Sequence, residues 1–260
     1  MQEIREVLEA LASGQINVDE AQKRLQKLEL QKVGDLAVID PGREHRSGIP
    51  EVVMAETKTS EQLMQILRAM LEVKDFVLAT RVNEKQVEYL ENHLADFEFD
   101  IRGGGNHMTL LVHHPRWIPK RTGGMIAIIT AGTSDEFFAE EAQAVAETMG
   151  VGVLRFRDVG VSGIHRLIEP LQKIREEQVH AIVVFAGMEG ALPTVVASLV
   201  DIPVIGVPVP IGYGHGGRGE TALASMLQSC APGLAVVNIG NGIGGGAIAA
   251  LIAVRASSES

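Results

Sequence analysis

The second half of the chain alternates between short apolar runs and helix-like segments, and this alternation limits the folds that it can adopt. The apolar runs occupy residues 125–130, 151–156, 181–187, 203–209 and 234–240. Continuous apolar strands separated by helices are typical of a parallel sheet covered by helices on both faces. We therefore predict an α/β fold whose C-terminal part is a three-layer, doubly wound parallel sheet.

The first half differs in composition and in pattern, since 24 of the 28 glycines lie after residue 102. Two short helix patterns, separated by Ser13 and Gly14, precede a mixture of strand-like and helix-like segments. The stretch 113–124 has two prolines, basic residues and a double glycine, as linkers often do. We expect a helical hairpin plus a smaller mixed α/β domain over residues 1–118, and the parallel-sheet domain over residues 119–260.

Charge and composition limit the kinds of partner that we expect. The net charge is −10, whereas a protein that binds nucleic acids or anionic membranes needs a basic face, so we expect neither partner. The single cysteine excludes a disulfide framework and a cysteine-rich zinc site. The N-terminus lacks an apolar signal core, and the apolar stretches are shorter than the roughly 18 residues of a membrane span. We expect a cytoplasmic protein that binds a small molecule.

The first apolar run ends in a polar loop at the edge where such sheets bind ligands, the carboxyl ends of the strands. Gly132, Thr133 and Ser134 offer backbone and side-chain groups that suit a phosphate or carboxylate. Asp135 suits a base or a partner for a ribose hydroxyl. Alternatively, these residues only cap the helix that follows.

The loop after the second run is rich in charge. Arg157 and Arg166 suit a phosphate clamp, Asp158 suits magnesium or a ribose, and His165 precedes the second arginine. Surface ion pairs are the alternative interpretation of these charges.

The turn 185–193 follows a very apolar run and contains Met188 and Glu189. A carboxylate between glycines and apolar residues can be partly desolvated, which raises its pKa and suits proton transfer. The alternative is a glutamate at a helix start that faces water.

Two further loops are dominated by glycine. Residues 211–220, which include His215, suit close backbone approach to a ligand or a moving lid, or else form a mobile surface loop. Residues 240–246, which include Asn241, contain a literal G-x-G-x-x-G, but in the last strand-helix unit rather than the first. We interpret this motif as close helix packing plus backbone approach to a ligand.

Cys230 lies in S-C-A-P-G, between a helix-like and a strand-like run. A lone thiol is either a nucleophile or a small buried apolar side chain, depending on its thiolate character. The helix patterns 191–200 and 246–254 are apolar nearly all round, which fits burial between subunits or, equally, fully buried core helices.

Taken in order, the motifs of the second half resemble the aminoimidazole ribonucleotide (AIR) carboxylase family. They are G-T-S-D at 132–135, V-S-G-I-H-R at 161–166, A-G-M-E-G-A-L-P at 186–193 and V-P-V at 207–209. The histidine loop has one extra residue, and Ala191 stands where the purine enzymes have a histidine before L-P.

The chain as a whole is more similar to the LarB family, the carboxylase/hydrolases that start the synthesis of the nickel-pincer nucleotide cofactor. The added motifs are G-R-E-H-R-S-G-I-P-E-V-V-M-A-E at 42–56 and S-C-A-P-G at 229–233. This resemblance implies nicotinic acid adenine dinucleotide, CO2 or bicarbonate and Mg2+ as reactants and cofactor. It implies pyridinium-3,5-biscarboxylic acid mononucleotide and AMP as products. The related carboxylase fold implies a homo-oligomer, commonly an octamer.

The resemblance also implies roles for residues. Cys230 would be the nucleophile, and Glu189 or Asp135 the base, while the ligands of magnesium stay unknown. Two alternatives remain at this point. A purine-type carboxylase or mutase would use His165 and no thiol, and a nucleotide-binding scaffold would bind a dinucleotide without releasing AMP.

Overall fold

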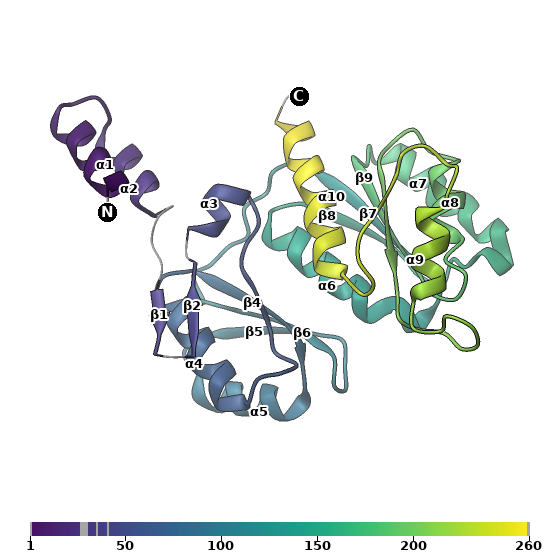
Figure 1. Cartoon of the computed structure of the whole chain (residues 1–260), viewed down its shortest axis with the longest axis horizontal. Coiled ribbons are helices and arrows are strands. Elements are labelled where there is room, and N and C mark those ends of the chain that lie inside the picture. Colours follow the sequence, from purple (N-terminus) through teal and green to yellow (C-terminus); the bar gives the residue numbers. More distant parts are fainter. Residues whose placement is uncertain (1, 27–30, 35, 41, 259–260) are drawn as a thin grey trace. The chain divides into compact units, whose positions relative to one another are not determined.

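The computed structural model describes residues 2–26, 31–34, 36–40 and 42–258, and it divides into two compact units, Met1–Trp117 and Ile118–Ser260 (Figure 1). The division falls within the linker-like stretch 113–124, where prolines and a double glycine interrupt regular structure.

The first unit begins with two helices, α1 (Gln2–Ala12) and α2 (Val18–Gln26). Gly14 has a φ of 72° in the turn between them, a conformation that favours glycine. An antiparallel ribbon follows, made of β1 (Gln31–Val33) and β2 (Ala37–Ile39). The short helix α3 (Arg43–Ser47) comes next.

A four-stranded mixed sheet forms the core of the first unit, in the order β3-β4-β6-β5. The strands are β3 (Val52–Met54), β4 (Phe76–Val82), β5 (Glu98–Arg102) and β6 (Met108–His113), and the helices are α4 (Ser60–Leu71) and α5 (Glu84–His93). Both helices begin with a capping box, from Thr59 and Gln62 for α4 and from Asn83 and Gln86 for α5. The helices bury their apolar faces, including Leu63, Leu67 and Leu90, in this core.

The second unit is a parallel five-stranded sheet in the order β11-β10-β9-β7-β8, and it confirms the predicted fold class. The strands are β7 (Met125–Thr130), β8 (Gly152–Phe156), β9 (Ala181–Ala186), β10 (Val204–Pro208) and β11 (Leu234–Val236). The helices are α6 (Glu136–Thr148), α7 (Ile168–Glu176), α8 (Leu192–Ala197), α9 (Glu220–Leu227) and α10 (Gly242–Ser257).

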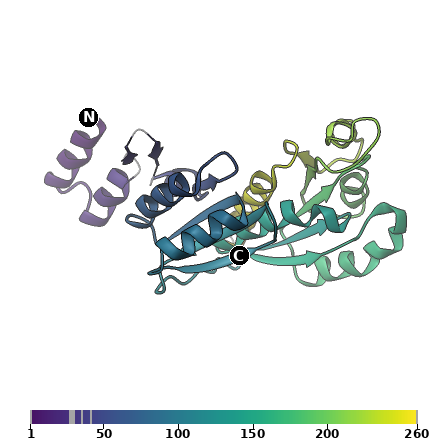
Figure 2. The same ribbon diagram turned by 90° about the horizontal axis from the view of Figure 1, so that it is seen from below.

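Successive residues of β7 face opposite layers of this unit. Ile126 and Ile128 pack in one core with α6 and α10, whereas Ala127 and Ile129 pack in the other with α7, α8 and α9. Figures 1 and 2 show these helices on the two sides of the strands. The chain leaves β7 for β8 over one face and returns to β9 over the other. The strand order therefore reverses between β7 and β9, the position where ligands bind in this architecture.

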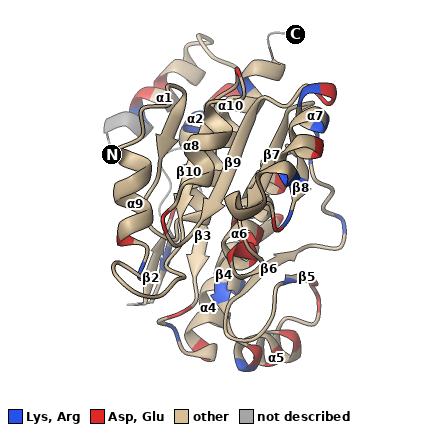
Figure 3. Ribbon diagram, turned by 90° about the vertical axis from the view of Figure 1, so that its right-hand side faces the viewer, with Lys and Arg blue, Asp and Glu red and all other residues tan. Residues whose placement is uncertain are grey.

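The two apolar helix patterns are only partly covered in the single chain. The α8 helix buries Leu192 and Val196, but Leu199 just after it is half exposed. Figure 3 shows α8 and most of α9 without charge. The α10 helix buries Ala249 and Ala250 and leaves Ile248 exposed. Within the described part of the chain, no helix is both long and apolar enough to cross a membrane.

Candidate active site

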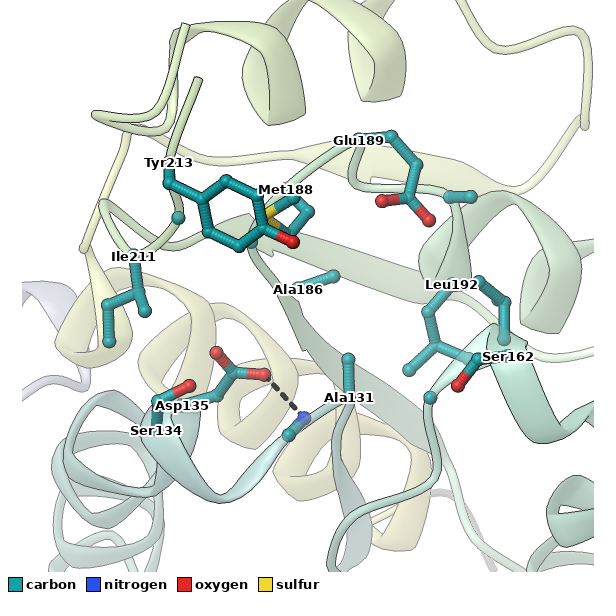
Figure 4. A pocket seen from close by; sticks show the side chains of 16 residues that line it. Ala131, Ser134, Asp135, Ser162, Ala186, Met188, Glu189, Leu192, Ile211 and Tyr213 are labelled. Carbon is teal, nitrogen blue, oxygen red and sulfur yellow. Dashed lines mark hydrogen bonds between the residues drawn. The ribbon is translucent and has the colours of Figure 1, made fainter. Parts of the chain in front are cut away.

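A cavity of about 670 Å³ opens at the carboxyl ends of β7, β8, β9 and β10 (Figure 4). It is formed by the loops that follow these four strands, and so it lies at the point where the strand order reverses. The lining residues are Ala131, Gly132, Ser134, Asp135, Gly160, Val161, Ser162, Ala186, Gly187, Met188, Glu189, Ala191, Leu192, Ile211, Gly212 and Tyr213.

Glycines let the four loops approach one another closely. The backbone N–H of Met188 donates to the carbonyl oxygen of Ile211 at 3.3 Å, and a side chain on Gly187 would collide with that same oxygen. A Cβ on Gly160 would lie 2.8 Å from the carbonyl oxygen of Ala131. These contacts hold the loops after β9 and β10 together, and likewise those after β7 and β8.

Asp135 is the buried ionisable group of the cavity, with 3% of its surface exposed. It ends a 3-10 turn, Thr133–Asp135, and its Oδ2 accepts a 2.8 Å hydrogen bond from the backbone N–H of Gly132. Burial raises the pKa of Asp135 to about 6, and the neighbouring Glu136 charge adds to the rise while backbone hydrogen bonds oppose it. A carboxyl with a pKa near neutrality can both accept and release a proton.

Glu136, the next residue, faces a different set of partners. Its Oε1 accepts from the Thr130 hydroxyl at 2.6 Å, and its Oε2 accepts from Arg155 at 2.7 Å and from Arg157 at 2.9 Å. Arg155 is nearly buried, and it also pairs with Glu140 of α6 at 3.3 Å. This network fixes the start of α6, and hence the turn that carries Asp135.

The charged loop after β8 forms ion pairs rather than a phosphate clamp in the single chain. Arg157 is engaged by Glu136, and Arg166 donates to the carbonyl oxygen of Asp158 at 2.7 Å and to its carboxylate at 3.1 Å. None of Arg157, Asp158 and Arg166 lines the cavity. Their ion pairs correspond to the alternative interpretation of these charges that the sequence allowed. Instead, Val161 and Ser162 of the same loop reach the cavity.

Met188, Glu189 and Tyr213 lie on one side of the cavity, and Ser134 and Asp135 lie on the opposite side (Figure 4). Met188 has a φ of 51°, unusual for a side chain with a Cβ, and such backbone strain is often found at functional sites. Glu189 is exposed in the single chain, so the desolvation expected from its apolar neighbours is absent there.

Four other predicted ligand-binding residues lie outside the cavity lining. Asn241 caps α10, since its Oδ1 accepts from the backbone N–H of Gly244 at 2.8 Å. Thr133, His165 and His215 are exposed. These four residues therefore do not line the cavity with Gly132, Ser134 and Met188, because a residue in such a loop can equally face solvent or cap a helix.

Cys230 is exposed and lies at the opposite edge of the sheet from the cavity. It follows α9, which starts at the cavity edge and runs back, and it precedes β11. The backbone N–H of Val204, the first residue of β10, donates to the carbonyl oxygen of Gly233 at 3.0 Å, so this loop lies at the amino ends of the strands. Within a single chain, Cys230 therefore does not reach the cavity that contains Asp135 and Glu189.

Several cavity residues were not singled out from the sequence, among them Ser162, Ile211 and Tyr213. Tyr213 could have been predicted, because it is one of only two tyrosines and lies among glycines in a loop that was already predicted to approach a ligand. Ser162 and Ile211 gave no comparable signal, since their positions depend on how far the loops fold over the sheet.

Comparison with known proteins matches both units to described families. Residues 30–104 match the LarB/PurE-like N-terminal domain, and residues 125–260 match AIR carboxylase. These two domains support a carboxylase-type function.

Three relatives illustrate the pattern of similarity. The chain is 40% identical over 253 residues to the uncharacterized protein MJ0165 of Methanocaldococcus jannaschii, with 96% of each chain covered. It is 35% identical over 132 residues to an N5-carboxyaminoimidazole ribonucleotide mutase of the same organism, covering 50% of this chain and 77% of the relative. The equivalent mutase of Saccharolobus solfataricus is 34% identical over 134 residues, covering 50% and 78%. The chain therefore belongs to the LarB family, with an AIR carboxylase domain as its C-terminal half.

Proposed function

We propose that the protein carboxylates the pyridinium ring of nicotinic acid adenine dinucleotide at carbon 5 and hydrolyses its phosphoanhydride. The products are pyridinium-3,5-biscarboxylic acid mononucleotide and AMP. The observation that carries the proposal is the buried carboxyl of Asp135, with a pKa of about 6, in a cavity at the reversal point of a chain of the LarB family.

The chemistry requires a nucleophile, because an electron-poor pyridinium ring does not attack CO2. The Cys230 thiolate would come from a neighbouring copy of the chain in the expected homo-oligomer, because Cys230 lies far from the cavity of its own chain. Its addition to carbon 4 gives a dihydropyridine, whose carbon 5 is an enamine carbon. Carbon 5 then forms a bond to CO2, a base removes the carbon 5 proton, and expulsion of the thiolate restores the aromatic ring. Nucleophilic catalysis thus divides one difficult step into easier ones.

Two carboxylates are candidates for the base. Asp135 is buried, and with a pKa of about 6 it is mostly ionised at neutral pH yet more basic than a free aspartate, so it can take the proton from carbon 5 and later release it. Glu189 lies at the cavity mouth and would need a further layer of protein to exclude water from it. We assign the proton transfer to Asp135 and a supporting role at the mouth to Glu189.

In the proposal, magnesium is bound mainly to the phosphates of the substrate. Among the described residues there is no group of three or more His, Cys, Asp or Glu side chains that could hold a metal ion. Mg2+ is usually bound through substrate phosphates plus one or two carboxylates, so a dedicated protein site is not required. The residues here do not form a site to which we can assign the ion, and we derive no step through it.

The test is mass spectrometry of the products after incubation of the protein with nicotinic acid adenine dinucleotide, bicarbonate and Mg2+. We expect a product that is heavier by one carboxyl group, together with AMP. Cys230→Ala and Asp135→Asn should each reduce turnover by at least about 1,000-fold while the fold is retained. Asp201→Asn, at an exposed carboxylate outside the cavity lining, is the matched control and should remain active.

Other outcomes would identify the alternatives. Conversion of a carboxyaminoimidazole ribonucleotide instead, with Cys230→Ala fully active, would indicate the purine-type mutase reaction that the names of several relatives describe. In the structure Ala191 occupies the cavity wall before Leu192, so that reaction would lack a histidine at this position. Tight dinucleotide binding without AMP release would indicate a scaffold.

A further inference from the structure

We propose that Glu136 is a positioning residue for the proposed reaction: held by Arg155 and Arg157, it keeps a negative charge beside Asp135 and so sets how readily Asp135 takes up a proton. The inference rests on the proposed function, in which Asp135 accepts the proton from carbon 5. The proton affinity of Asp135 can also be measured without any substrate, so the inference has a test of its own.

The first observation is the place of the Glu136 carboxylate. Asp135 and Glu136 are consecutive residues at the start of α6, yet Asp135 lines the cavity and Glu136 does not. The Oε1 of Glu136 accepts from the hydroxyl of Thr130 at 2.6 Å, and Thr130 is completely buried at the end of β7. Its Oε2 accepts from Arg155 and Arg157. These hydrogen bonds fix a carboxylate one residue away from the base, outside the space that the substrate would occupy.

The second observation is that the two arginines compensate this carboxylate unequally. The Arg155 side chain is 11% exposed, and it is shared between Glu136 at 2.7 Å and Glu140 at 3.3 Å. The Arg157 side chain is 63% exposed, so water screens much of its charge. One nearly buried cation thus serves two carboxylates, and Glu136 keeps part of its negative charge uncompensated.

The third observation concerns the other charges around Asp135. The α10 helix, which packs against α6, has no charged residue before Arg255. Glu189 and Tyr213 share the cavity with Asp135, but both are exposed. The other charged or titratable groups on the neighbouring elements are Glu140 and Glu141 of α6, Arg155 of β8, Arg157, Asp158, His165 and Arg166 of the segment after β8, and His215, Arg218 and Glu220 of the segment after β10.

Among these groups, Glu136 is the one whose charge adds to the effect of burial in raising the pKa of Asp135 to about 6. A more basic carboxylate is a better proton acceptor as long as it stays ionised at the working pH. Because Glu136 does not line the cavity, its charge can raise the basicity of Asp135 without contacting the anionic substrate. Asp135 would exchange the proton, and Glu136 would adjust how strongly that proton is held.

Direct titration of Asp135 tests the proposal. The infrared absorbance of protonated carboxyl groups, taken as the difference between each protein and its Asp135→Asn variant, follows this residue alone. In Glu136→Gln the midpoint should fall by about one pH unit, because a negative charge is removed and the arginines lose their partner. In Arg157→Gln it should rise slightly, because a positive charge is removed. Glu177→Gln, at an exposed carboxylate just after α7, is the control and should leave the midpoint unchanged.

The pH profile of carboxylation gives a second readout. The rate should fall at low pH as Asp135 is protonated, and this fall should move to lower pH in Glu136→Gln. At higher pH, kcat should drop roughly 3- to 10-fold in this variant with an unchanged KM, because a weaker base takes the proton less readily. Glu136→Asp keeps the charge and should restore most of the wild-type profile.

Two results would overturn the proposal. One is an unchanged infrared midpoint in a folded Glu136→Gln variant, and the other is a downward shift in Arg157→Gln. If Glu136→Gln does not fold, the direction of the shift in Arg157→Gln decides, because that side chain is mostly exposed. If the wild type does not convert the dinucleotide, the proposed function fails, while the infrared titration still decides whether Glu136 sets the proton affinity of Asp135.

Discussion

At the scale of single residues, the burial of Asp135 makes the stability of the protein depend on pH. A carboxyl whose pKa is raised on folding binds its proton more tightly in the native state than in the unfolded chain. Its contribution is therefore fully favourable at low pH and is lost as the pH rises from about 4, the value for a free aspartate, to about 6. The buried carboxyl of Asp135 is therefore held at a cost in stability at neutral pH.

Asp135→Asn should remove this dependence. Asparagine keeps the size of the side chain and an oxygen that can accept from the N–H of Gly132. Between pH 5 and 7.5 the free energy of unfolding of the wild type should fall by about 1.4 kcal/mol relative to the variant. Urea unfolding across this range measures the difference. Asp201→Asn is the control, because it keeps Asp135 and should therefore keep the fall. A wild type whose stability does not fall relative to Asp135→Asn would contradict a raised pKa for Asp135.

At the scale of elements, the cavity depends on close contacts between loops. The turn after β9 passes so near the loop after β10 that only a hydrogen fits at Gly187. Similar contacts at Gly160 join the loops after β7 and β8. Glycine in these loops therefore has a packing role, in addition to the flexibility that its abundance suggests.

Gly187→Ala should push these two loops apart. The added methyl group overlaps the carbonyl oxygen of Ile211, which is backbone and cannot rotate away. We expect a loss of roughly 1–3 kcal/mol in the stability of the second unit, together with weakened dinucleotide binding. Calorimetry and a binding titration measure the two effects. Gly104→Ala, where the new methyl group meets open space, is the control and should change neither.

The capping boxes of the first unit offer a second test at this scale. The Thr59 side chain accepts from the backbone N–H of Gln62 at 3.2 Å and so satisfies the first turn of α4. Thr59→Ala should lower the stability of the first unit by about 1 kcal/mol. Thr57→Ala, two residues earlier and outside the capping box, should be nearly neutral in the same denaturation experiment. Equal losses for both would exclude a specific capping effect.

At the scale of the whole molecule, the second unit has more apolar surface than a monomer needs. Leu199, Leu227 and Ile248 are each at least 42% exposed. We predict a closed homo-oligomer, and the resemblance to the carboxylase family suggests eight subunits. Leu227→Glu should place a charge in the interface and reduce the molar mass measured by light scattering, without loss of helical circular dichroism. Val73→Glu, at an exposed position in the first unit, should keep the wild-type mass. A monomeric wild type would contradict the prediction.

The sequence predicted the architecture better than it predicted the site. Strands of a covered parallel sheet must be apolar on both faces, so runs such as 125–130 and 181–186 identified the fold, and it is confirmed. Asp135 and Glu189, which were predicted because they lie in loops that follow strands, both line the cavity. The partners of Arg157 were not predictable, since its ion pair with Glu136 joins residues 21 positions apart.

Cys230 shows a different kind of limit. Its position at the amino ends of the strands follows from topology, because it comes after a helix and before a strand in a parallel sheet. The resemblance implied a homo-oligomer and a catalytic role for Cys230, but it did not indicate from which copy of the chain the thiol would come. Neither periodicity nor motif spacing indicates which residues of different copies meet.

The two outer strands of the parallel sheet also bear on solubility. An exposed strand edge presents unpaired backbone groups that can recruit strands from other molecules and start aggregation. Here β11 is only three residues long, and β8 at the other edge carries the nearly buried charge of Arg155. A short edge strand and an inward-facing charge both discourage such recruitment. The largely apolar second unit can therefore associate through its helices and loops while its sheet stays closed to growth in either direction.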